Sequence, residues 1–214
     1  MANKNDISEM YSRKSGLVIG FHGCDESIRD AVLNGKADLR ASENEYDWLG
    51  SGIYFWENNY DRALQYAKDL KKFSKQAVRP IEKPSVIGAI LDLGFCMDLM
   101  DSTYLEILSA SYKELEAFQR KFNFTLPKNR TIGKGMDLLL RNLDCTVIEA
   151  THKFREESNS NPFDSVRGVF FEGKDLYPNA GFKEKNHIQI AIRNPNCIKG
   201  YFLPKEPNNL YTIP

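Results

Sequence analysis

The sequence has no excess of charge of either sign, because 29 basic residues balance 29 acidic ones. No overall electrostatic field therefore draws the chain to nucleic acid or to an anionic membrane, although a local basic groove stays possible. It also has few cysteines, and the four present include no C-x-x-C pair and follow no zinc-module spacing. They are too few for a disulfide scaffold in a chain of this length, so we expect buried, reduced thiols and no metal site. These residues are Cys24, Cys96, Cys145 and Cys197.

Long apolar segments are missing as well. No run of apolar residues is long enough to cross a bilayer, and the first residues contain no apolar core of a secretion signal. There is no internal repeat, low-complexity tract or Pro/Ser-rich linker. With 214 residues, 42% of them hydrophobic and 27% charged, the composition is typical of a globular protein. We therefore expect one cytoplasmic domain over residues 1–214 that makes no contact with a membrane.

Apolar periodicity predicts strands near both ends of the chain and helices in its middle. The predicted strands cover residues 17–22, 49–56, 84–93, 166–171, 187–193 and 197–203, with a further short strand at 146–149. The predicted helices cover residues 26–34, 61–74, 104–108, 112–122 and 136–143, and loops cover 156–164 and 172–186. This order indicates an α+β fold with a helical insertion at about 98–145, because a regular α/β fold would alternate strands and helices throughout.

The first candidate site segment is His22-Gly23, at the end of an apolar strand. A glycine there allows a ligand to approach the backbone closely. Taken alone, the two residues fit a core histidine and a turn better.

The second segment is Gly50-Ser51-Gly52-Ile53, followed by three aromatic residues. Strand alternation places Tyr54 and Trp56 on one face and Phe55 on the other. The third glycine of a dinucleotide fingerprint is missing, so the two glycines alone indicate no Rossmann site. The aromatic face suits stacking on a planar ring, and the alternative is a set of core aromatics.

The third segment, residues 187–193, alternates strictly. Its isoleucines share one face, while His187, Gln189 and Arg193 share the other. The pattern indicates a strand between a core and a cleft, or a strand whose polar face is in water.

Together these segments resemble the ADP-ribosyltransferases of the diphtheria-toxin and poly(ADP-ribose) polymerase type, which carry a His–Tyr–acid/amide triad. His22-Gly23 matches the first motif. The run from Gly50 to Phe55, followed by Ala63 and Tyr66-Ala67, matches the second. The resemblance is close over residues 17–70, plausible over 166–203 and absent between them. The arginine-triad toxins fit less well, since no Ser-Thr-Ser strand and no late E-x-E motif is present.

The resemblance implies split antiparallel sheets around a cleft that binds NAD as co-substrate. His22 would bond the adenosine ribose and the Gly23 backbone the nicotinamide carboxamide. Tyr54 and Tyr66 would enclose the nicotinamide ring. The remaining implied NAD contacts are Gly52, Phe55 and Ala63.

Gln189 stands where the resemblance implies a catalytic glutamate. An amide can orient the ribose but stabilises positive charge less than a carboxylate does, and it cannot act as a base. This favours transfer of a single ADP-ribose over chain formation. Glu172 is the nearest candidate for the missing carboxylate, and its alternative is an exposed glutamate at a strand end.

The predicted function is mono-ADP-ribosyl transfer from NAD to a macromolecular acceptor, protein or nucleic acid. An intracellular toxin or defence effector, held by an antitoxin or inhibitor protein, would fit the resemblance. The alternatives are an NAD glycohydrolase, an inactive domain that binds a nucleotide or a partner, and a plain interaction protein.

The resemblance implies that the loop at 173–186 faces the acceptor. Lys183 and Lys185, with Arg193 on the cleft face, would suit a phosphate-bearing acceptor, and Tyr177 and Phe182 could stack on a base. An ordinary mixed-charge loop is the alternative.

Overall fold

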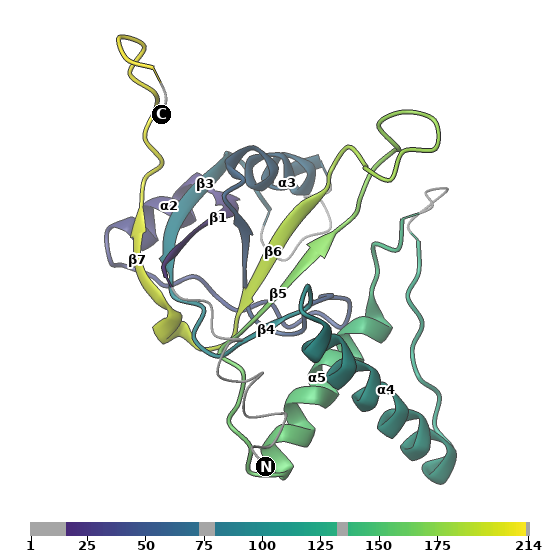
Figure 1. Ribbon diagram of the computed structural model, residues 1–214. Helices are drawn as coiled ribbons and strands as arrows, with labels where there is room; N and C mark the ends of the chain where they lie inside the picture. Colours follow the sequence, from purple (N-terminus) through teal and green to yellow (C-terminus); the bar gives the residue numbers. More distant parts are fainter. Residues whose placement is uncertain (1–15, 73–79, 132–136, 213–214) are drawn as a thin grey trace.

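The fold is built on one seven-stranded sheet in the order β4-β5-β6-β2-β1-β3-β7 (Figure 1). The computed structural model describes residues 16–72, 80–131 and 137–212. The strands are β1 (Val18–Asp25), β2 (Ile53–Glu57), β3 (Pro84–Leu91), β4 (Cys96–Asp98), β5 (Ser165–Phe170), β6 (His187–Ile192) and β7 (Ile198–Phe202). The helices are α2 (Glu26–Leu33), α3 (Tyr60–Lys72), α4 (Ser102–Phe122) and α5 (Asn142–Glu157). The predicted α+β class is confirmed.

The sheet is mixed rather than purely antiparallel. Neighbouring strands pair antiparallel except β4 and β5, which are parallel. A parallel pair needs a long crossover connection, and here that connection contains α4 and α5. One continuous sheet therefore replaces the two antiparallel sheets that the resemblance implied.

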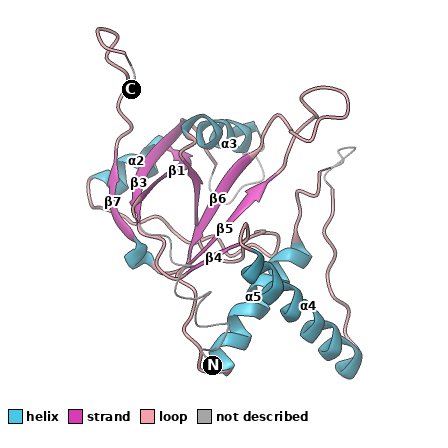
Figure 2. Ribbon diagram, in the orientation of Figure 1, coloured by secondary structure: helices cyan, strands magenta, loops and turns pink. Residues whose placement is uncertain are grey.

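The helices form two groups, which Figure 2 separates clearly. Helices α4 and α5 pack on each other at one end of the molecule, whereas α2 and α3 lie against β1 and β3. Asp101 caps α4 by accepting a hydrogen bond from the Thr103 N–H at 2.8 Å. None of the described helices combines the length and apolar character that a bilayer crossing requires.

Three predictions in the insertion are wrong. The strand predicted at 146–149 lies inside α5, where Val147, Ile148 and Thr151 are buried at helical spacing. The helix predicted over 136–143 is not formed at 137–141, since α5 begins at Asn142. The two helical pieces predicted within 104–122 are one helix, α4. The predicted helix 61–74 corresponds to α3, and Phe73 and Ser74 lie outside the described residues.

Two apolar clusters lie on opposite faces of the sheet. Phe55, Ile190 and Ile192 belong to the cluster that α2 covers, so the predicted core face of 187–193 is confirmed. Ala191, one residue away, belongs to the cluster formed with α4 and α5. All four cysteines are buried, as expected.

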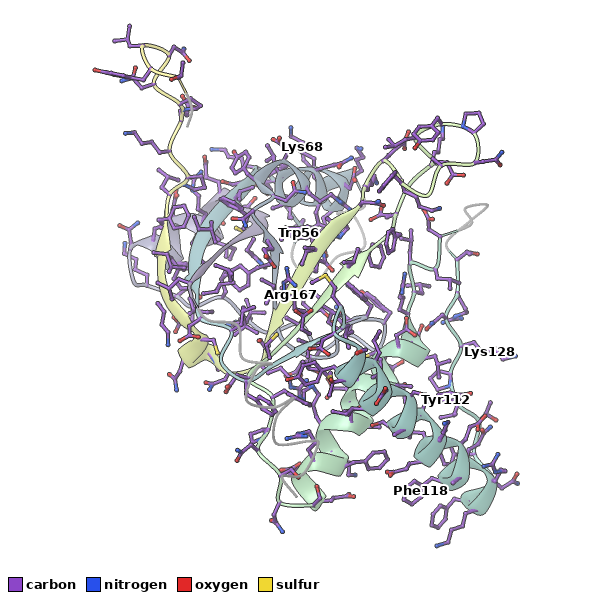
Figure 3. All side chains as sticks on the ribbon, in the orientation of Figure 1. Trp56, Lys68, Tyr112, Phe118, Lys128 and Arg167 are labelled. Carbon is purple, nitrogen blue, oxygen red and sulfur yellow. The ribbon has the colours of Figure 1, made fainter. Side chains whose placement is uncertain are left out.

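Arg167 on β5 forms ion pairs with residues of two other strands, β2 and β4. It is 6% exposed and pairs with Glu57 on β2 and with Asp98 on β4, the latter at 3.1 Å. Figure 3 labels it near the middle of the sheet. Removing one partner of a buried ion pair leaves an uncompensated charge, which costs far more than losing an exposed pair.

We expect Arg167→Met to lower the free energy of unfolding by about 3–5 kcal/mol, because Glu57 and Asp98 would stay buried without their cation. The matched control is Arg120→Met on α4, whose side chain is 72% exposed and should change stability by less than about 1 kcal/mol. Urea unfolding followed by circular dichroism measures both. Equal losses of stability in the two variants would contradict the conclusion that the buried ion pairs of Arg167 stabilise the fold.

Candidate functional site

A cleft of about 680 Å³ opens on the sheet beside α3. Strands β1, β2, β5 and β6, helix α3 and the segment 40–52 all contribute to its walls. Residues that line it include His22, Gly23, Gly52, Tyr54, Trp56, Arg62, Tyr66, Phe170, Glu172, Lys185, His187 and Gln189. Residues from all three candidate segments are therefore brought to one place.

The cleft lies where β1 and β2 part. The two strands pair at Gly20–Glu57 and Phe21–Trp56, and the ladder then stops. Beyond this point the His22 side chain bridges the strands, with Nδ1 2.8 Å from the Tyr54 carbonyl oxygen. A side chain thus replaces the next main-chain bond and leaves the backbone of Gly23 at the cleft wall.

The environment of His22 determines its protonation. Burial lowers the pKa of the imidazole below its ordinary value, so the ring is neutral at pH 7. A carbonyl oxygen only accepts hydrogen bonds, so Nδ1 carries the proton and donates to Tyr54. Nε2 is therefore a hydrogen-bond acceptor, available to a hydroxyl or N–H group of a ligand.

Gly23 is required by packing as well as by access. A Cβ at this position would lie 2.1 Å from the backbone oxygen of Ala63. Only glycine lets the first turns of α3 approach β1 this closely. The short approach brings Arg62 and Tyr66 of α3 to the cleft.

Tyr54 forms a fixed wall of the cleft. Its hydroxyl donates to the Gly50 carbonyl at 2.8 Å and accepts from the Leu49 N–H at 3.0 Å. Burial raises the pKa of Tyr54 well above its ordinary value, so it is a neutral ring. Gly50 itself has φ +75°, a conformation that favours glycine, and Tyr54 holds this turn in place.

Tyr66 presents an aromatic ring from α3. It packs 4.8 Å from Trp56, centroid to centroid, and is 38% exposed. Burial raises the pKa of Tyr66 to about 12, so it too is neutral. Tyr54 and Tyr66 thus provide aromatic surface from two different elements of one cleft.

Three residues expected at the cleft lie elsewhere. Phe55 is fully buried on the opposite face of β2, as strand alternation requires. Ala63 is fully buried against Gly23. Arg193 points to α5, where it pairs with Glu149 at 2.8 Å.

Gln189 is held by a tryptophan that the sequence did not identify. The Trp48 indole N–H donates to Gln189 Oε1 at 2.5 Å. An indole nitrogen can only donate, so the amide oxygen must face Trp48. The NH₂ group of Gln189 is then the part available to a ligand, where a glutamate would offer an acceptor.

Glu172 lies in the cleft but is neutralised by two cations. Its Oε2 accepts from Arg62 Nη2 at 2.5 Å, and its Oε1 accepts from Lys185 Nζ at 3.1 Å. The side chain is 14% exposed, so the alternative of an exposed glutamate at a strand end is wrong. In this arrangement Glu172 is a partner of these cations rather than a free base.

Sequence reasoning missed the roles of Trp48 and Arg62. Their partners lie 141 and 110 residues away in the chain, and no local pattern marks such pairs. His187 was placed on the polar face of its strand and does line the cleft. Burial lowers its pKa to about 4, so it is neutral.

Comparison with known proteins leaves the family open. No protein-family model and no solved structure matches the chain. The chain is 23% identical over 199 residues to "Uncharacterized protein MJ0359" of Methanocaldococcus jannaschii, covering 84% of this chain and 83% of that protein. A likeness of this degree assigns neither family nor activity, so function has to be argued from the cleft.

We expect Gly23→Ala to lower the free energy of unfolding by about 1–3 kcal/mol, because the new Cβ would meet the Ala63 backbone oxygen. Gly200→Ala is the matched control, since no atom lies within 4 Å of a Cβ there. It should be neutral or stabilising by up to about 1 kcal/mol. Thermal unfolding compares the two, and a Gly23 variant as stable as the parent would show that α3 moves away without cost.

Proposed function

We propose that this chain is an NAD-dependent mono-ADP-ribosyltransferase that releases nicotinamide and transfers ADP-ribose to a macromolecular acceptor, protein or nucleic acid. The observation that carries the proposal is the meeting of His22, Gly23, Tyr54, Tyr66 and Gln189 in one cleft. They come from β1, β2, α3 and β6, which are separated in the chain. The resemblance in the sequence assigns these same residues to NAD.

The groups at the cleft wall suit the parts of NAD. Nε2 of His22 can accept a hydrogen bond from the adenosine ribose, and the Gly23 backbone can bond the carboxamide. The rings of Tyr54 and Tyr66 can stack on nicotinamide, which is planar and apolar on its faces. Because the Tyr54 hydroxyl is already bonded to the backbone, its ring is preorganised before the ligand arrives.

The reaction needs little from the protein beyond position and electrostatics. The bond between ribose C1′ and the nicotinamide nitrogen breaks, its electron pair leaves with neutral nicotinamide, and an oxocarbenium-like centre develops. The acceptor's oxygen or nitrogen then bonds C1′ from the opposite face and gives up its proton. Orienting NAD and the acceptor lowers the barrier by making the attack effectively intramolecular.

Gln189 favours a single transfer. Its amide can hold the ribose hydroxyls but stabilises the developing cation less than a carboxylate would. The same feature favours a second candidate function, a domain of this type that binds NAD without turnover. The two differ in whether nicotinamide is released.

Purified protein should be incubated with labelled NAD, alone and with separate protein, RNA and DNA fractions of a cell extract. We expect nicotinamide release together with label on one fraction. Tyr54→Ala should abolish both, because a wall of the nicotinamide pocket is lost, whereas Tyr211→Ala, 76% exposed and outside the cleft, should behave like the parent.

Release without label would point to an NAD glycohydrolase instead. Binding of NAD without release would favour the inactive domain. Full activity in the Tyr54→Ala variant would remove Tyr54 from the site and, with it, the proposal.

Gln189→Glu should keep NAD binding and raise nicotinamide release roughly tenfold or more. One carboxylate oxygen would accept from Trp48 as the amide oxygen does, and the other would face the ribose. Gln65→Glu, an exposed change on α3, controls for the added charge. Steady-state release kinetics measure both, and an unchanged rate in the Gln189 variant would exclude it as the third catalytic residue.

A further inference from the structure

Arg62 is the least satisfied charged group of the cleft. It is 8% exposed, and its Nη2 donates to Glu172 at 2.5 Å. Within the described residues, its Nε and Nη1 are buried and have no hydrogen-bond partner. Buried guanidinium donors left unpaired are unfavourable, and such an exception in a structure calls for a ligand or another explanation.

Arg62 and Lys185 already bind the same anionic group, the carboxylate of Glu172. Each cation takes a different oxygen of the Glu172 carboxylate. A phosphate group offers the same kind of oxygen atoms, more of them and more negative charge. The two cations therefore bind anionic oxygen atoms at this place, and a phosphate would compete with Glu172 for them.

The surrounding charge favours an anion. Lys72 and Lys185 join Arg62 at this end of the cleft, against the two carboxylates of Glu172 and Asp69. Arg62 also lies in the first turn of α3, whose N-terminus adds positive potential. One positive charge thus remains uncompensated among these five groups.

The position of the cluster indicates which substrate supplies the anion. Glu172 follows β5 and Lys185 precedes β6, so the pair closes the base of the loop that connects these strands (Figure 1). That loop carries Tyr177 and Phe182, which are both more than half exposed and do not line the cleft. Since Lys185 lines the cleft and stands at the base of the loop, a molecule that lies along the loop could place an anion here.

We propose that Arg62 and Lys185 form a phosphate-binding subsite for the acceptor, separate from the NAD site, in which Glu172 occupies the place of the phosphate until the acceptor binds. The assignment to the acceptor rests on the proposed function, whereas the anion site itself rests on the geometry. Arg62 is a binding residue here, and Glu172 is its internal competitor.

Inorganic phosphate is the probe, titrated at constant ionic strength against sodium chloride. Both tryptophans of the chain line the cleft, and Arg62 lies 5.9 Å from the centre of the Trp56 ring, so intrinsic fluorescence reports binding. Arg62→Gln should weaken phosphate binding roughly tenfold or more. Glu172→Gln should tighten it, because the competing carboxylate is gone.

Lys68→Gln is the matched control. It removes one positive charge from the same helix, but its side chain is exposed and does not line the cleft (Figure 3). It should bind phosphate like the parent. Equal binding by the parent and the Arg62 variant, or no tightening in the Glu172 variant, would overturn the subsite.

A titration with NAD at saturating phosphate separates the two possible sources of the anion. Unchanged NAD affinity supports a separate acceptor subsite. Competition between NAD and phosphate would assign the cations to the diphosphate of NAD and overturn the proposal. If NAD neither binds nor turns over while phosphate follows the expected pattern, the proposed function fails and the anion site stands.

Discussion

The cleft exists because β1 and β2 stop pairing after two residue pairs. The His22 side chain takes over from the main chain at that point, through its bond to the Tyr54 carbonyl. This single interaction fixes the tautomer of His22 and the spacing of the two strands that carry the first two motifs. Next to this bond, α3 packs directly against the backbone of Gly23, where a residue with a side chain would not fit. The other walls of the cleft surround this hydrogen bond between His22 and Tyr54.

Long-range partners decide what the polar residues of the cleft can do. Trp48 turns the amide of Gln189 so that its oxygen is occupied. Arg62 and Lys185 each bind one oxygen of Glu172, so both carboxylate oxygens already have a partner. Two residues that looked interchangeable as the third catalytic group are therefore different. Gln189 offers a hydrogen-bond donor to a ligand, whereas Glu172 is tied to the cations that an incoming anion would use.

Each error of prediction has its own cause. Thr146, Val147 and Ile148 have β-branched side chains, which favour strands, and a strand was therefore predicted over residues 146–149. Packing of Val147 and Ile148 within the helical end of the molecule overrode that preference and extended α5 to Glu157. The sheet was expected in two parts because the resemblance implied it, and the motifs themselves do not report which strands pair. Strand β4 was not predicted, and its parallel pairing with β5 is seen only in the structure.

Local pattern was sufficient for the α+β class, for six of the strands and for the face of β6 that meets the core, because side-chain alternation and helical periodicity are properties of neighbouring residues. The resemblance to a known family singled out seven of the residues that line the cleft: His22, Gly23, Gly52, Tyr54, Tyr66, Glu172 and Gln189. Only the tertiary structure decided the pairings of Trp48 with Gln189 and of Arg62 with Glu172. Such bonds join residues more than a hundred positions apart, and they depend on strand order and helix placement, which leave no signature in any short stretch of sequence.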